Sequence, residues 1–242
     1  MKIFSLSSGS KGNATLLECD NFNILIDVGC SKKYLNQSLL EINKDINDID
    51  MVLMTHFHSD HCKSINCFSN EIIFSTKEEH KKLLVNEDNK FIDISIKPFE
   101  LSHDERCYGY QIKYQGLIYT HISDTGYLKN DYLKYIEESD YLYLEFNHDP
   151  IMLNKTNRPN FVKRRILSNK GHLNNQAAAL ALVKHSSKLK QVFIAHISEE
   201  ANDAHIIEDE IKQVFNDYNK EITFDILFTG HEKLVIGGLN ED

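Results

Sequence analysis

The chain has 242 residues, of which 41% are hydrophobic and 26% are charged. This composition is typical of a folded globular protein, and it excludes a disordered tail or a small disulfide-stapled module. Lys and Arg number 27 against 36 Asp and Glu, a net charge of −9, and as a whole-chain value this charge argues against a nucleic-acid partner.

Short β-branched and aromatic runs alternate with longer segments of mixed polarity along the chain. We expect strands over 2–7, 14–19, 22–27, 50–55, 71–75, 95–101, 108–114, 117–121, 140–145, 191–196 and 222–228. We expect helices over 31–42, 61–69, 76–86, 129–138, 173–187 and 203–218. Tight turns at 9–13 and 20–21 indicate antiparallel hairpins in a layered α/β fold. No repeat or Pro/Gly linker interrupts the pattern, so we expect one domain over 1–242.

The first residues have no apolar core of the kind found in a signal peptide, and no apolar stretch approaches the roughly 18 residues of a membrane span. We therefore expect a cytoplasmic protein with no membrane partner. The five cysteines form no CxxC pair, and in the cytosol they would stay reduced.

The densest group of possible metal ligands follows the predicted strand 50–55. The run Thr55-His56-Phe57-His58-Ser59-Asp60-His61 places His56 and His58 on one side of an extended segment, and Asp60 and His61 follow at the turn. Imidazole nitrogen and carboxylate oxygen together suit one or two adjacent divalent ions. The alternative is a polar surface loop that happens to be rich in histidine.

These residues match the HxHxDH signature, and the chain resembles the metallo-β-lactamase fold superfamily. The resemblance implies an α/β fold, a four-layer αβ/βα sandwich with two divalent metal ions. It implies that His56, His58 and His103 hold one ion, that Asp60, His61 and His196 hold the other, and that Asp124 bridges them. Asp60 would then also be catalytic, and Asp27 would brace the histidine loop. Taken alone, Asp27 reads as a cap or turn residue. The ligand types permit Zn or Mn, and also Fe or Ni.

The acidic charge is unevenly distributed. Residues 150–198 hold nine of the 27 Lys and Arg residues and none of the 36 Asp and Glu residues. Within this segment the guanidinium groups of Arg164 and Arg165 suit bidentate phosphate contacts. A positive field near His196 favours a phosphodiester substrate, although the lysines could also belong to a solvated helix face.

His172 stands just before the Ala-rich predicted helix 173–187. Its setting is similar to that of the motif histidine in tRNA 3′-processing and related phosphodiesterases, although Leu173 and Asn174 replace the usual Ser-Thr pair. The resemblance implies a histidine that protonates the leaving oxygen as a general acid. The alternative is a helix-capping or surface histidine.

A more specific similarity runs nearly the length of the chain. The segments 7–13, 145–149, 164–168, 171–173 and 193–198 resemble those of the YycJ/WalJ group of bacterial metallo-β-lactamase fold proteins. This resemblance implies a 5′→3′ exodeoxyribonuclease acting on DNA, or less readily on RNA. It implies substrate or ligand-supporting roles for Asn13, Asn147, His148, Arg164 and Arg165. By itself the 7–13 loop reads rather as a plain hairpin turn, and His148 reads equally as a hydrogen-bonded turn residue before Pro150.

Two other functions fit parts of the sequence. One is a small-molecule hydrolase on the same scaffold that cleaves a thioester, lactone, lactam or cyclic phosphodiester. The other is a binding or regulatory protein that keeps its metals for structure. Salt-sensitive substrate binding would separate a nuclease from the first, and metal-dependent turnover would exclude the second.

Overall fold

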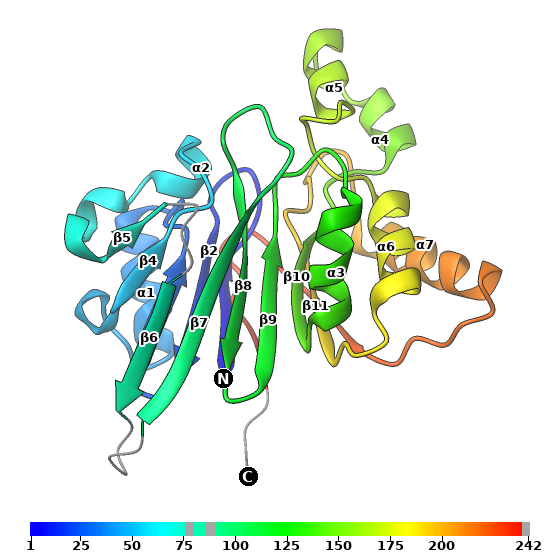
Figure 1. Cartoon of the computed structure of the whole chain (residues 1–242). Helices are drawn as coiled ribbons and strands as arrows, with labels where there is room; N and C mark the ends of the chain where they lie inside the picture. Colours follow the sequence, from blue (N-terminus) through cyan, green and yellow to red (C-terminus); the bar gives the residue numbers. More distant parts are fainter. Residues whose placement is uncertain (76–79, 86–90, 239–242) are drawn as a thin grey trace. The chain divides into compact units, whose positions relative to one another are not determined.

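The computed structural model describes residues 1–75, 80–85 and 91–238 (Figure 1). The chain divides into two compact units. Unit 1 comprises Met1–Phe99, Tyr110–Ile118 and Thr229–Asp242, and unit 2 comprises Glu100–Gly109 and Tyr119–Phe228. Strands β8 (Tyr108–Tyr114) and β9 (Leu117–Ile122) carry the chain from one unit to the other.

Unit 1 contains a six-stranded sheet in the order β13-β1-β2-β3-β4-β5. Its strands are β1 (Lys2–Ser7), β2 (Ala14–Cys19), β3 (Phe22–Ile26), β4 (Met51–Leu53), β5 (Ile73–Phe74) and β13 (Val235–Gly238). The hairpins β1-β2 and β2-β3 are antiparallel, whereas β3, β4 and β5 run parallel. At one edge β13 pairs antiparallel with β1, with Lys2 opposite Gly238.

Helix α1 (Lys32–Glu41) accompanies this sheet in unit 1. Ser31 caps the helix by accepting a hydrogen bond from the backbone N–H of Tyr34, and Leu35 and Leu39, on one helical face, enter the core. The short helix α2 (Ser59–Cys62) and the 3₁₀ turns η1 (Ile46–Asp48), η2 (Ile65–Cys67) and η3 (Asn70–Ile72) lie in the connections around β4.

Strands β6 (His80–Val85) and β7 (Phe91–Glu100) show that one predicted helix is wrong. The two strands pair antiparallel, with His80 opposite Ile96. The predicted helix 76–86 is therefore wrong over 80–85, because strand pairing overrides the local helical preference of this charged segment. Residues 76–79 and 86 lie outside the described residues.

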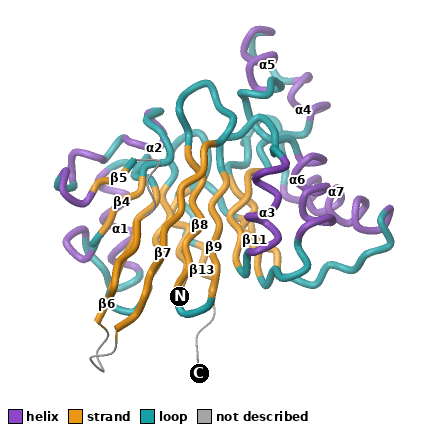
Figure 2. The backbone as a smooth tube through the Cα atoms, in the orientation of Figure 1, coloured by secondary structure: helices purple, strands orange, loops and turns teal. Residues whose placement is uncertain are grey.

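Unit 2 contains parallel strands in the order β12-β11-β10-β9. β10 is Tyr141–Glu145, β11 is Gln191–Ala195 and β12 is Asp225–Phe228. Three helices pack beside them: α3 (Asn130–Glu138), α6 (Asn175–His185) and α7 (Ala204–Asp217) (Figure 2). Small buried side chains such as Ala178 and Ala181 let α6 approach its neighbours closely.

Two further helices of unit 2 project away from its strands in Figure 1: α4 (Pro150–Lys155) and α5 (Asn160–Ile166). Asp149 caps α4 by accepting from the N–H of Met152 at 2.7 Å, and Pro150 occupies the first turn, where its missing N–H costs nothing. Leu153 and Ile166 bury themselves against Ala201 in a small separate core. These helices were not predicted.

Most other predicted elements are confirmed within a few residues. The exception is 61–69, which holds only the end of α2 and the η2 turn. Ser64 donates from its N–H to the carbonyl of Val28 and from Oγ to the carbonyl of Cys30, and these bonds draw the backbone away from a continuous helix. Among the described residues, no helix is long and apolar enough to cross a membrane.

Candidate active site

In unit 1 the predicted histidine motif starts where β4 ends. β3 and β4 are parallel neighbours, with Ile26 opposite Leu53, so the residues after each strand meet at one edge of the sheet. Asp27 accepts from the N–H of Thr55 at Oδ1 and from its hydroxyl at Oδ2, both at 2.8 Å. Asp27 therefore fixes the first residue of the motif.

Asp27 also holds a histidine of the motif. Its Oδ2 lies 2.7 Å from Nδ1 of His61, and both side chains are buried. Burial raises the pKa of Asp27, and the neighbouring His61 opposes that rise. A hydrogen bond from Nδ1 leaves Nε2 as the ligand nitrogen, which is the arrangement of a carboxylate bracing a metal-bound histidine. The bracing role predicted for Asp27 has the contacts it needs.

The other two histidines converge on each other. Nε2 of His56 and Nδ1 of His58 are 3.0 Å apart, and the ring centroid of His56 is 4.1 Å from that of His61. Two nitrogens bound to one tetrahedral Zn²⁺ at about 2.0–2.1 Å lie roughly 3.3 Å apart. Asp60 Oδ2 is 3.7 Å from Nε2 of His61. The spacing of these donors fits shared divalent ions.

Asn13 joins the loop 7–13 to the histidine motif 55–61 by hydrogen bonds. Its Oδ1 accepts from the N–H of Gly9 at 2.8 Å, and its Nδ2 donates to the carbonyl of Gly9 at 3.1 Å. The same amide lies 3.0 Å from Nε2 of His61 and donates to the carbonyl of Asp60. The predicted supporting residue Asn13 thus joins the loop to two predicted ligands.

Gly29 makes the close packing of this region possible. A Cβ at Gly29 would lie 1.6 Å from the carbonyl oxygen of Asp60. The N–H of Val28 donates to the carbonyl of His61 at 2.8 Å, so the loop after β3 lies directly against the backbone of the histidine motif. Only glycine leaves room for this approach.

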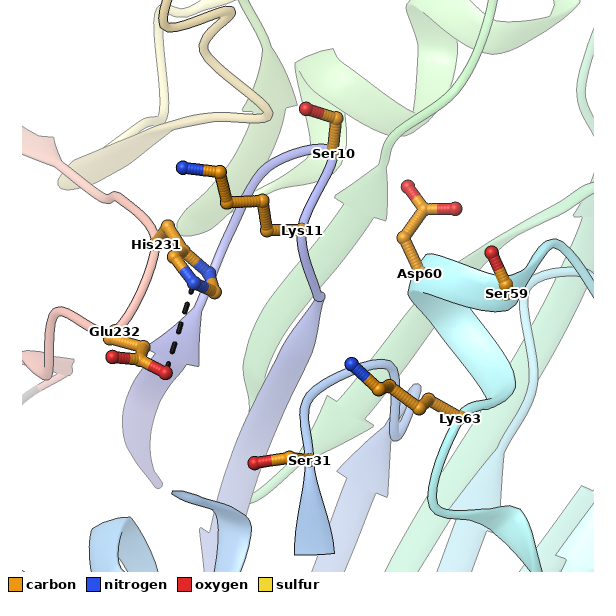
Figure 3. Close-up of a pocket in the computed structure, with 8 residues that line it drawn as sticks. All are labelled: Ser10, Lys11, Ser31, Ser59, Asp60, Lys63, His231 and Glu232. Carbon is orange, nitrogen blue, oxygen red and sulfur yellow. Dashed lines mark ion pairs between the residues drawn. The ribbon is translucent and has the colours of Figure 1, made fainter. Parts of the chain in front are cut away.

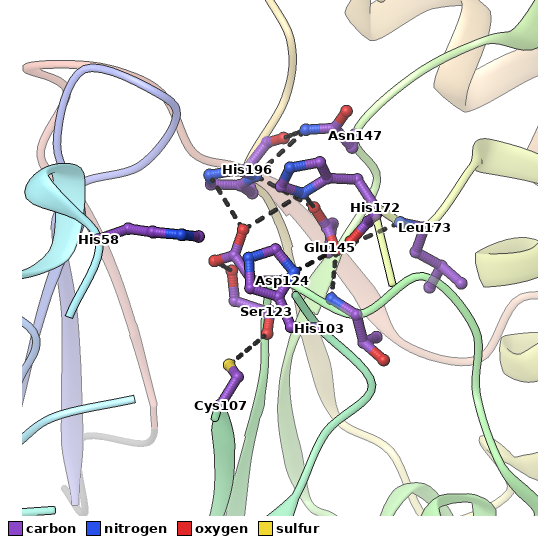
Figure 4. Close-up of polar contacts among 12 residues, drawn as sticks. His58, His103, Cys107, Ser123, Asp124, Glu145, Asn147, His172, Leu173 and His196 are labelled. Atoms are coloured by element: carbon purple, nitrogen blue, oxygen red, sulfur yellow. Dashed lines mark hydrogen bonds and ion pairs between the residues drawn. The ribbon is translucent and has the colours of Figure 1, made fainter. Parts of the chain in front are cut away.

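In unit 2 a second group of predicted residues gathers at the carboxyl ends of β9, β10 and β11. Parallel pairing sets Glu145 opposite Ala195 and Leu144 opposite Ile122, so Asp124, Glu145 and His196 emerge at the same edge. Together with His172, they offer ligand atoms that all lie within 4.8 Å of one another (Figure 4). Nε2 of His196 is 3.6 Å from Oδ1 of Asp124.

Glu145 is the residue of this group that was not assigned from the sequence. It is fully buried, and its Oε1 lies 2.7 Å from Nδ1 of His172 and 3.0 Å from Nδ1 of His196, while Oε2 accepts from the N–H of Thr125. One carboxylate therefore sets the orientation of two histidines. The sequence did offer one signal for Glu145, since a charged residue directly follows the apolar run 141–144. A charge buried at such a position needs partners.

The charges of Glu145 and His172 stabilise each other. Burial alone would raise the pKa of Glu145, but the charge of His172 and hydrogen bonds from His172 and His196 lower it to about 2. Burial alone would lower the pKa of His172, but Glu145 and Asp124 raise it to about 9. His172 is partly exposed, and its Nδ1 is 3.2 Å from Oδ1 of Asp124. The pair therefore favours a protonated His172.

His103 lies beside this group in unit 2. Its Nδ1 is 3.2 Å from the carbonyl of Gly171, its Nε2 is 3.1 Å from Oδ1 of Asp104, and its ring centroid is 5.5 Å from that of His172. Burial lowers the pKa of His103, and Asp124 opposes this effect. A neutral ring that donates from Nδ1 would leave Nε2 as the ligand nitrogen, and a bound ion would then replace the contact of Nε2 with Asp104.

The predicted supporting residues of unit 2 differ in their surroundings. Asn147 donates from Nδ2 to the carbonyl of His196 at 2.9 Å. His148 is buried, burial lowers its pKa to about 4, and neither ring nitrogen has a hydrogen-bond partner among the described residues. On α5, Arg165 pairs with Asp104 at 2.6 Å. Arg164 is exposed and makes no ion pair within the part of the chain that the structure describes.

Backbone conformation marks three of the predicted site residues. Asp27, Asp124 and His196 have positive φ values of 59°, 56° and 50°. Residues other than glycine rarely adopt this left-handed conformation, and it concentrates at functional sites that the surrounding structure holds in place. Each of the three follows a strand, at the point where the chain turns to present its side chain.

Comparison with known proteins identifies the family. Residues 5–92 match the family model described as "Anti-Pycsar protein Apyc1". The exodeoxyribonuclease WalJ of Streptococcus pneumoniae serotype 2 is 32% identical, with 81% of each chain covered. The exodeoxyribonuclease YycJ of Bacillus anthracis is 31% identical, with 88% of each chain covered.

Solved structures show the fold. The metallo-β-lactamase fold protein YhfI from Bacillus subtilis matches with a TM-score of 0.70 at 14% identity, covering 98% of this chain and 99% of that one. The short form of human tRNase Z matches with a TM-score of 0.60 at 15% identity, covering 97% and 98%. The predicted metallo-β-lactamase fold is confirmed. The chain belongs to the WalJ/YycJ family of metallo-β-lactamase fold proteins, and it is a metal-dependent hydrolase.

Proposed function

We propose that this chain is a dinuclear metal-dependent exodeoxyribonuclease that degrades DNA from its ends in the 5′→3′ direction. The observation that carries the proposal is the similarity to WalJ and YycJ, both named exodeoxyribonucleases, over 81% and 88% of the chain. The convergence of His56 with His58, and of Asp124 with His196, supports a metal-dependent reaction. The activity belongs to one metallo-β-lactamase-like domain over 1–242.

The ligand assignment follows the family motif residue by residue. His56, His58 and His103 hold one divalent ion, Asp60, His61 and His196 hold the other, and Asp124 is shared. When bound, such ions lower the pKa of water and neutralise charge that develops on phosphoryl oxygens. Zn²⁺ or Mn²⁺ suits these donors, and Fe or Ni ions are compatible with them.

The roles of the surrounding residues follow from their contacts. Asp27 and Glu145 hold the Nδ1 atoms of His61 and His196, at 2.7 and 3.0 Å, so that each Nε2 is directed for binding. Oε1 of Glu145 also lies 2.7 Å from Nδ1 of His172, and its negative charge favours the protonated form of that ring. His172 then protonates the leaving oxygen as a general acid when the phosphodiester bond breaks.

The substrate assignment is also supported by a surface of unit 2. Residues 150–170, here called the basic arm, contain α4 and α5 and carry six Lys and Arg residues but no Asp or Glu. Arg158 pairs with Glu200, and Arg165 pairs with Asp104. Among the described residues, Lys155, Arg164 and Lys170 make no ion pair. Phe161, also in the arm, is 68% exposed to solvent. Free cations beside an exposed aromatic ring suit a nucleic-acid strand.

The proposal is tested with metal-stripped protein reloaded with Mn²⁺ or Zn²⁺. The substrates are double-stranded DNA, single-stranded DNA and RNA labelled at either end, together with a thioester, a β-lactam and a cyclic phosphodiester. We expect mononucleotides released from the 5′ end of DNA only when metal is present. Hydrolysis of a small molecule with intact DNA would favour a small-molecule hydrolase instead.

A double variant tests the ligand set in the same assay. His61→Ala with Asp124→Asn removes one proposed ligand from each unit, and we expect metal content and cleavage to fall together. His205→Ala with Asp131→Asn changes the same residue types at exposed positions and should change neither. Full cleavage by the first variant would refute the ligand assignment.

Salt dependence tests the basic arm. Removing one phosphate-binding cation lowers the slope of log affinity against log salt by about 0.7–0.9. The triple variant Lys155→Ala, Arg164→Ala, Lys170→Ala should therefore bind DNA more weakly and with a shallower slope. A control replaces Lys32, Lys33 and Lys212, which are exposed on α1 and α7. Equal slopes for both triple variants would show that the arm does not bind phosphate.

A further inference from the structure

A polar cavity of about 490 Å³ lies in unit 1 beside the histidine motif (Figure 3). Its size falls in the range of about 300–1,000 Å³ typical of small-ligand sites. The residues that line it are all polar or charged: Ser10, Lys11, Ser31, Ser59, Asp60, Lys63, His231 and Glu232. Side chains of these types offer charges and hydrogen bonds to a bound group.

The cavity contains two ammonium groups. Lys11 comes from the turn after β1 and Lys63 from the end of α2, and Figure 3 shows both side chains at the cavity with the hydroxyls of Ser10 and Ser59. Lys63 is exposed and makes no ion pair with any residue that the structure describes. Two ammonium groups and several hydroxyls are donors that a phosphate monoester, with a charge of about −1.5 to −2, binds well.

The cavity also contains two carboxylates, those of Asp60 and Glu232. Asp60 is a proposed metal ligand, and Glu232 lies 3.8 Å from Nε2 of His231. A positive ion at Asp60 would offset its negative charge toward an incoming anion. With such an ion bound, two ammonium groups face one remaining carboxylate, that of Glu232, which leaves the cavity with a net positive charge.

The wall formed by the turn 9–13 is held by hydrogen bonds and tied to the proposed active site. Ser7 donates from Oγ to the carbonyl of Gly12 at 2.8 Å, and Gly12 donates from its N–H to the carbonyl of Gly9 at 3.0 Å. Asn13 then joins this turn to the backbone of Asp60. A group bound in the cavity would consequently lie next to Asp60 in a fixed position, without a large cost for ordering a loop.

We propose that this cavity binds the terminal 5′-phosphate of the DNA strand that is cut, so that the enzyme selects 5′-phosphorylated ends. The inference rests on the proposed exodeoxyribonuclease function. When an enzyme removes one nucleotide at a time from a 5′ end, the terminal phosphate lies one nucleotide from the bond that is broken. A phosphate site that shares Asp60 with the proposed metal ligands stands at the place where such an end would dock.

The test compares two duplexes of one sequence, one with a 5′-phosphate and one with a 5′-hydroxyl. For the unmodified protein we expect kcat/KM to be about 10- to 100-fold higher on the phosphorylated end, as one or two charged hydrogen bonds would give. In Lys63→Ala this ratio should fall toward one, and Lys63→Arg should restore part of it. Lys33→Ala removes an exposed lysine outside the cavity and should keep the original ratio.

A second measurement does not depend on turnover. With metal bound and with phosphorothioate linkages that resist cleavage, fluorescence anisotropy should show tighter binding of a 5′-phosphorylated oligonucleotide than of its 5′-hydroxyl twin, and Lys63→Ala should abolish the difference. A deoxynucleoside 5′-monophosphate should compete for the phosphorylated oligonucleotide, and the corresponding nucleoside should not. If competition by the monophosphate persists unchanged in Lys63→Ala, the cavity is not the phosphate site.

The outcomes separate the two proposals. If the unmodified protein degrades neither duplex, the exodeoxyribonuclease function fails. If it degrades both ends at equal rates, that function stands and the 5′-phosphate site is refuted. A full 5′-phosphate preference in Lys63→Ala would also refute the assignment to this cavity.

Discussion

Asp27 Oδ2 lies 2.7 Å from Nδ1 of His61, while the same carboxylate accepts two hydrogen bonds from Thr55. A single buried group thus fixes the first and last residues of the segment 55–61. The motif is held by contacts between two parallel strands rather than by the motif sequence itself.

Replacing Asp27 by Asn should weaken metal binding. The amide keeps the shape of the carboxylate, but it removes the negative charge that orients His61. We expect metal affinity to fall roughly 10- to 100-fold, as measured by calorimetric titration of the metal-free protein. Asp20→Asn is the matched control, because Asp20 is exposed and its φ of 52° suits Asn. Equal affinities in the two variants would contradict the bracing role.

Replacing His172 by Asn should separate catalysis from metal binding. As a general acid, His172 contributes about 10²- to 10⁴-fold to the rate, so cleavage should slow by that factor while metal content, measured by mass spectrometry, stays unchanged. Because His172 lies within ligand distance of Asp124 and His196, loss of metal from this variant would identify it as a ligand instead. His205→Asn, at an exposed position, controls for loss of a histidine.

Glu18 predicts a pH-dependent contribution to stability. Burial would raise its pKa, but hydrogen bonds from Lys44 and Lys2 outweigh burial and lower the pKa below 4.5. A lowered pKa in the folded state means that the ion pairs stabilise the fold above pH 4.5 and lose their effect as the pH falls through the folded-state pKa.

The variant Glu18→Gln should therefore be less stable at pH 7 by about 0.2–1 kcal/mol, measured by urea denaturation. The difference should shrink steadily below pH 4.5. A difference that grows as the pH falls would have the wrong sign for this carboxylate.

Two glycines should respond differently to alanine. Gly29→Ala places a Cβ on the backbone of Asp60, and we expect a cost on the order of 3 kcal/mol from overpacking. Gly116 has a φ of 77° and open space around its Cβ position, so Gly116→Ala should cost only about 1–2 kcal/mol from backbone strain. Urea denaturation in chelator compares the two without a contribution from metal. A larger loss at Gly116 would contradict this ranking.

Much of the candidate site could be predicted because its residues follow strands. His56, Asp124 and His196 each come shortly after a short apolar run that is easy to read as a buried strand. Glu145 escaped assignment because it is the last residue of a strand, and only parallel pairing with β9 and β11 shows that it faces two histidines. Such a contact joins residues far apart in sequence.

The errors in the predicted secondary structure have a similar origin. Residues 80–85 have a charged, helix-favouring composition, yet they pair with β7, because a partner strand can outweigh local preference. Helices α4 and α5 are too short for an apolar period to be evident, and their stability comes from capping by Asp149 and from the small core at Ala201. The prediction of one domain over 1–242 stays a prediction.

The pairing of β1 with β13 has a consequence for how the protein is made. Lys2 lies opposite Gly238, so β1 gains its second partner strand only after β13 has been synthesised. During translation, one side of β1 has no native partner strand. A chain that stops before Val235 would keep this edge open, and an open strand edge readily pairs with other chains. A variant that stops before Val235 should therefore aggregate more readily than one that contains β13.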